Sequence, residues 1–201
     1  MKKEQKPRDR SSSQLADDLI WRSFKSAESS LNAAYKVFKV GKALDQFFLN
    51  MLMQTRTFQF ELVLQMTMLE GIAPTGFARA VAMKGLIHLV VEYRKHLDTA
   101  SIPTMLKYAA SRGIPFEEVD VRALRARYRP TFKEIDGWEK IRNKATGHYD
   151  GDVELVVQLM ESVDYEAVIK IVRSFMTFNV ELITLLRKSG LPDDHPERQQ
   201  T

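Results

Sequence analysis

The sequence predicts an all-α protein, a bundle of about five or six helices that forms a single domain. Apolar residues recur at three- and four-residue intervals over several long stretches, as they do on one face of a helix. No stretch shows the sustained alternation of apolar and polar residues that marks a half-buried strand. Glycines and prolines separate the periodic stretches, and 201 residues suffice for one core without disulfides.

The elements follow from this periodicity and from the helix-stopping residues between the stretches. In the first two thirds of the chain, helices are expected over 15–40, 43–69, 77–97 and 116–128, with a short helix from Pro103. Segment 98–103 is expected to be the exit of the third helix, and Gly113 and Pro115 mark a stop and a turn. A later helix begins near Thr131 and carries an apolar stripe as far as Gly147. A loop should then lead to a last, core-forming helix over 164–188.

The two ends of the chain differ from the body in composition. Residues 1–13 are rich in Lys, Arg, Ser and Pro, so we expect a disordered basic arm, followed by the helical domain over 14–190. Residues 191–201 are expected to form a polar, disordered tail. The chain has a net charge of +4, of which the first ten residues supply +3. Net charge alone therefore gives little support for nucleic-acid binding by the domain.

Composition and motifs exclude several kinds of chemistry. The absence of cysteine excludes disulfides, thiolate metal sites and a cysteine nucleophile, and it fits a reducing, cytoplasmic location. No secretory signal and no apolar stretch long enough to cross a membrane is present, so no membrane association is expected. Phosphate-binding glycine loops and the H-E-x-x-H metal motif are absent, and neither a metal nor a cofactor is expected.

The chain has four histidines, and three of them offer little as site residues. His195 lies in the polar tail and His96 follows charged residues, whereas His88 lies among apolar residues and is interpreted as a hydrogen-bonded core side chain. His148 is different, because it follows Arg142, Asn143 and Lys144 at a helix-to-loop break. An imidazole exchanges protons near neutral pH, and a guanidinium binds phosphate oxygens, so the pair suits RNA cleavage without a metal.

The segment Arg142-Asn143-Lys144-Ala145-Thr146-Gly147-His148 resembles the R-x(4–6)-H motif of the HEPN superfamily. A long motif-bearing helix, a short loop and a last apolar helix over 131–189 resemble its abortive-infection branch. The resemblance implies a helical homodimer that cleaves RNA in a toxin or phage-defence setting, sometimes with an antitoxin partner. Arg142 and His148 would be catalytic, and Asn143 would support them. One alternative is that the motif has no functional role, so that Arg142 and Lys144 form a solvated helix edge and His148 caps the helix. The alternative function is a non-catalytic HEPN-like module that binds RNA, a nucleotide or a protein partner through the same basic region.

Geometry and charge supply two further expectations. Positions 142 and 148 lie about 120° apart around an ideal helix, so they converge only if the helix unwinds near Gly147 or if a second subunit completes the site. Lys144 lies one turn before His148 and is expected to approach either the histidine or a bound phosphate. Upstream, Arg125, Arg127 and Arg129 are expected to guide RNA to the site, with Tyr128 stacking on a base, although a solvated basic helix face explains them equally well.

Overall fold

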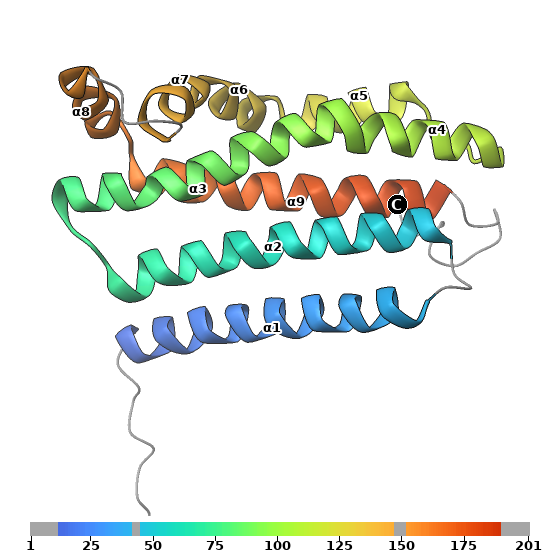
Figure 1. Ribbon diagram of the computed structural model, residues 1–201, viewed down its shortest axis with the longest axis horizontal. Coiled ribbons are helices and arrows are strands. Elements are labelled where there is room, and N and C mark those ends of the chain that lie inside the picture. Colours follow the sequence, from blue (N-terminus) through green and yellow to red (C-terminus); the bar gives the residue numbers. More distant parts are fainter. Residues whose placement is uncertain (1–11, 42–44, 147–151, 190–201) are drawn as a thin grey trace, which may run out of the picture.

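The computed structural model describes residues 12–41, 45–146 and 152–189, and every regular element within these ranges is helical. The expected all-helical bundle is therefore confirmed. Figure 1 shows its long helices lying alongside one another, with shorter helices over one side. The long helices are α1 (Ser12–Val40), α2 (Gln46–Ile72), α3 (Gly76–His96) and α9 (Tyr165–Ser189). The expected arm and tail lie outside the described residues, except that Ser12 and Ser13 already belong to α1.

The aromatic centre of the core is on α9. Phe175 and Phe178 lie one turn apart on this helix, and both are fully buried. Rings from three other helices surround Phe175, with centroids 6.0–6.4 Å away: Phe58 of α2, Tyr93 of α3 and Phe132 of the shorter-helix layer. Helical spacing on α9 places its apolar residues on one broad face, and α2, α3 and the shorter helices pack against this helix.

Helix α1 is the least covered of the long helices. It packs on α2, and Ala34 is the one fully buried side chain among its residues 18–40. Large apolar side chains on the same helix remain exposed, including Leu19, Trp21 and Val40. Within the described ranges, no helix is both long enough and apolar enough to span a bilayer.

Helix α3 does not end at the expected exit over 98–103, and that prediction was wrong. The chain continues through a π-helical segment, η1 (Leu97–Ser101), into α4 (Ile102–Arg112). Pro103 has no backbone N–H and its ring crowds the preceding turn, so a regular α-helix cannot run through this point. The wider π turn resolves the conflict, because the Ile102 amide donates to the Leu97 carbonyl five residues earlier.

The expected stop after α4 is confirmed, since Gly113 has a φ of +64° and ends the helix in the left-handed conformation. Helix α5 (Glu118–Arg127) follows with a capping box between Glu117 and Asp120. The single helix expected from Thr131 is divided into α6 (Arg129–Gly137), α7 (Glu139–Ile141) and the π-helical η2 (Arg142–Thr146). These segments lie beside α3 and run toward its N-terminal end (Figure 1).

The loop expected before the last helix contains a further helix, α8 (Val153–Glu161), so that expectation was wrong. Its apolar residues have helical spacing, and the Asp152 side chain caps it by accepting from the Leu155 amide at 3.0 Å. Helix α8 is short and follows a glycine in the sequence, so the helical spacing of its apolar residues was not recognised. Helix α8 packs against α3 and η2 and shares a pocket with the first turns of α3.

Candidate active site

Arg142 stands where the motif-bearing segment changes its winding. Gly137 weakens the helix before it, and the chain turns at Trp138, whose buried indole anchors the turn. The Arg142 amide still donates to the Trp138 carbonyl at 2.9 Å. From Arg142 onward the backbone is π-helical, a winding that recurs at functional sites in helical proteins.

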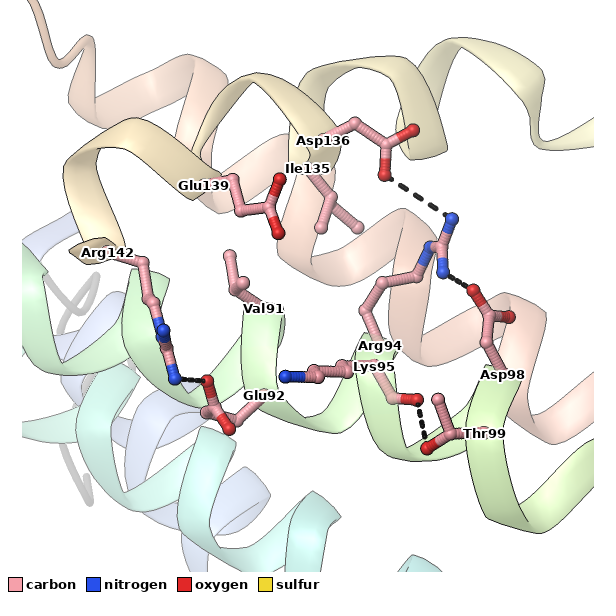
Figure 2. A pocket seen from close by; sticks show the side chains of 10 residues that line it. All are labelled: Val91, Glu92, Arg94, Lys95, Asp98, Thr99, Ile135, Asp136, Glu139 and Arg142. Atoms are coloured by element: carbon pink, nitrogen blue, oxygen red, sulfur yellow. Dashed lines mark hydrogen bonds and ion pairs between the residues drawn. The ribbon is translucent and has the colours of Figure 1, made fainter.

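The Arg142 guanidinium contacts two neighbouring side chains. Its Nη2 forms an ion pair with Oε1 of Glu92 on α3, as Figure 2 shows. Its Nη1 donates to Oδ1 of Asn143 at 2.7 Å. Because the guanidinium is planar, these contacts from two directions define the orientation of its plane. The side chain is 32% exposed, so the charge is oriented and still reachable from solvent.

Arg142 and Glu92 lie on the wall of an open pocket of about 250 Å³ between α3 with η1 and the α6–α7 segment (Figure 2). The ionisable side chains that line the pocket are Glu92, Arg94, Lys95, Asp98, Asp136, Glu139 and Arg142. Carboxylates therefore outnumber cations in this lining. An anion would be bound here by individually placed cations rather than by a broadly positive field.

The far end of the pocket is closed by a charged network over an aromatic ring. Asp98 of η1 forms ion pairs with Arg94 of α3 and Arg125 of α5. Both guanidiniums lie over the ring of Phe132, at 4.9 and 5.6 Å from its centroid. Arg94 also reaches Asp136 at 3.3 Å. This network ties the shorter-helix layer to α3 beside Arg142.

The residues expected to guide RNA do not share one face. Arg125 turns toward Asp98, whereas Arg127 and Tyr128 contact Glu181 of α9 at 3.0 and 2.6 Å. Arg129, at the start of α6, is exposed. The structure therefore distributes this basic stretch over two sides of α5.

Tyr128 is held within the protein. Its hydroxyl donates to Glu181, and its ring packs edge-on against Phe178 at 5.5 Å. Burial, followed by this hydrogen bond, raises the pKa of Tyr128 to about 12. The side chain is half-buried, so stacking on a base would require it to leave these contacts.

His148 lies outside the residues that the structure describes. Asn143 and Lys144 are exposed on η2, next to Arg142 in the chain. The structure thus joins Arg142 and Asn143 by a hydrogen bond and places Lys144 on the same short segment. Within the described ranges, no group of three or more His or carboxylate side chains is arranged to hold a metal ion.

Sequence reasoning missed a polar row on α3. Lys84, His88 and Glu92 are spaced four residues apart and are all half-buried, so they follow one another along one face of the helix. His88 is not among the buried core residues with which it was grouped. The four-residue spacing was visible in the sequence, but the apolar neighbours of His88 obscured it.

The chain was compared with protein-family models, with curated proteins and with solved structures, and none of them matches it.

Proposed function

We propose that this protein is a metal-independent endoribonuclease of the HEPN type. The observation that carries the proposal is the environment of Arg142, the first residue of the R-x(4–6)-H pattern. It is the junction residue of a π-helical segment, it is oriented by Glu92 and Asn143, and it opens onto a pocket. The two partners hold the guanidinium in one orientation at the edge of the pocket, as binding of a phosphate through its planar fork requires.

In the proposed reaction the 2′-hydroxyl of the substrate attacks the adjacent phosphorus. The O2′–P bond forms as the P–O5′ bond breaks, giving a 2′,3′-cyclic phosphate and a free 5′-hydroxyl. Arg142 binds the non-bridging oxygens and stabilises the charge that develops on them. His148 transfers a proton to or from one of the reacting oxygens, and Asn143 holds the arginine. Lys144 and the exposed Arg129 supply phosphate contacts, and Arg125, Arg127 and Tyr128 contribute after rearrangement of their present contacts.

We further propose that the protein acts in the cytoplasm as a homodimer, in a toxin or phage-defence system with an antitoxin or other protein partner. Exposed large apolar side chains on α1, α2 and α3, among them Trp21, Ile72 and Phe77, support association with another protein surface. A second subunit would also bring two copies of the motif together around a twofold axis. Size-exclusion chromatography with light scattering measures the stoichiometry. A monomer that cleaves RNA at full rate contradicts the composite site.

Cleavage of single-stranded RNA in the presence of EDTA tests the activity. The wild-type protein should produce fragments with cyclic phosphate ends, and Arg142→Ala and His148→Ala should each abolish them while their circular dichroism stays native. Lys170→Ala, which removes an exposed cation from α9, is the control and should leave cleavage unchanged. Undiminished cleavage by His148→Ala would overturn the assignment.

A second candidate is a non-catalytic helical module that binds RNA, a nucleotide or a protein partner. The excess of carboxylates in the pocket favours the protein partner among these, since an RNA or a nucleotide is attracted less there. Binding of RNA by the wild-type protein without any cleavage, under conditions in which a known ribonuclease is active, selects this candidate.

A further inference from the structure

His88 lies at the edge of the buried face of α3. The buried side chains of this helix include Ile87 and Val90, which are both fully buried, and successive residues are rotated by about 100° around a helix. His88 is half-buried, and the residues one turn before and after it, Lys84 and Glu92, are also half-buried and charged. The imidazole of His88 is therefore at the margin of the core and not enclosed by it.

The path of the chain brings the motif segment over this part of α3. Asp136 of α6 pairs with Arg94, and Arg142 of η2 pairs with Glu92, two residues closer to the start of α3. Helix α8, which follows η2, packs against the first turns of α3. Segment η2 itself also packs on α3. The turn of α3 between Glu92 and the region of α8 is the turn that carries His88.

The distance between His88 and the arginine site is set by the helix. Side chains four residues apart on a helix have Cβ atoms roughly 6 Å from each other, and Glu92 contacts Arg142 directly. An imidazole one turn from Glu92 is therefore within a phosphodiester's reach of the guanidinium. A single phosphate bound by Arg142 could present one of its ester oxygens to His88.

We propose that His88 is a catalytic proton-transfer residue of the site that contains Arg142. This inference rests on the proposed ribonuclease function and adds a residue to it. As the O2′–P bond forms and the P–O5′ bond breaks, one proton leaves the 2′-oxygen and one is delivered to the 5′-oxygen. The imidazole of His88 carries out one of these transfers, as acceptor from the first oxygen or donor to the second. Glu92 orients Arg142, and Lys84 adds positive charge on the opposite side of the imidazole.

Two amide substitutions test the proposal with a mixed-sequence single-stranded RNA in EDTA. His88→Gln and His88→Asn retain hydrogen-bonding groups near the positions of the two ring nitrogens, but an amide does not transfer protons at neutral pH. Both variants should lower the single-turnover cleavage rate at saturating RNA by about 100-fold or more. RNA affinity and the melting temperature should stay close to those of the wild type. His96→Gln is the matched control, because His96 lies on the side of α3 that contacts Gln54, and it should cleave normally.

The possible results separate this proposal from the one on which it rests. Loss of cleavage in Arg142→Ala together with a rate within about fivefold of wild type in either His88 variant overturns the role of His88 and keeps the ribonuclease. Absence of cleavage by the wild-type protein overturns both. A loss of rate in His88→Gln and His88→Asn that His96→Gln does not share supports both.

Discussion

Glu92 of α3 and Arg142 of η2 form an ion pair that joins the central helix of the bundle to the motif segment. The pair connects residues fifty positions apart in the chain, and Asn143 holds the same guanidinium from its own side. Glu92 is only partly buried, so its contribution to stability is small compared with its effect on the direction of the guanidinium. Its importance for the proposed function is therefore geometric.

Replacing Glu92 with Gln is expected to lower the cleavage rate by roughly 10- to 100-fold, because a catalytic group displaced by about 1 Å loses that order of rate. The amide keeps the size of the side chain and removes the charge. Single-turnover kinetics and RNA affinity, measured side by side, separate orientation from binding. Glu139→Gln removes a carboxylate from the same pocket and should change the rate little. An equal effect of both variants would mean that pocket charge, not orientation of Arg142, sets the rate.

The stability of the shorter-helix layer should depend on Asp98. Its carboxylate pairs with Arg94 and Arg125, whose guanidiniums both lie over the Phe132 ring. Asp98→Asn leaves two partly buried positive charges beside each other, and the free energy of unfolding should fall by about 1–2 kcal/mol. Urea unfolding measures it.

Asp136→Asn is the matched control for this prediction. Asp136 also contacts Arg94, at 3.3 Å, but its side chain is 62% exposed. Exposed pairs of this kind contribute at most about 1 kcal/mol, and often nothing measurable. A larger loss for Asp136→Asn than for Asp98→Asn would show that the network over Phe132 is not what holds this layer.

The long helices were predictable because helical spacing of apolar residues reports directly on burial, and α1, α2, α3 and α9 follow that spacing. The continuation of α3 through η1 could not be predicted in this way. Pro103 indicates a break in the α-helix, but it does not indicate whether the helix ends there or continues through a π-helical turn. At the site, the sequence singled out Arg142 and Asn143, which are in contact. The role of Glu92 could not be predicted from the sequence, because it depends on how η2 packs on α3, which is a tertiary relationship.

The core should be most sensitive at Phe175. This ring is fully buried and contacts rings on α2, α3, α6 and its own helix. Phe175→Ala leaves a cavity that the surrounding rings cannot fill, so the free energy of unfolding should fall by about 3–5 kcal/mol. Val180→Ala on the same helix, where the side chain is 48% exposed, should stay within about 0.5 kcal/mol. Chemical denaturation measures the free energy of unfolding of both variants. A similar decrease in the two would mean that Phe175 is not at the centre of the core.

The start of α2 should respond to pH through Asp45. The hydroxyl of Tyr108 donates to Asp45 Oδ2 at 2.7 Å, and this bond is the largest cause that holds the pKa of Asp45 below its ordinary value of 3.8. The Phe47 amide and Arg112 act in the same direction, while burial opposes them. A lowered pKa in the folded state stabilises the protein above the unfolded pKa. That stability is lost as the pH falls through the folded pKa.

Tyr108→Phe removes the strongest of these interactions and keeps the ring that stacks on Phe47 at 4.0 Å. The pKa of Asp45 should therefore rise, and acid unfolding should begin at a higher pH than in the wild type. NMR titration of the Asp45 carboxyl carbon measures the first effect, and circular dichroism against pH measures the second. Tyr35→Phe, which removes a hydroxyl from an exposed ring on α1, should change neither. A pKa of Asp45 that is the same in Tyr108→Phe and the wild type would show that Phe47 and Arg112 suffice to hold the carboxylate.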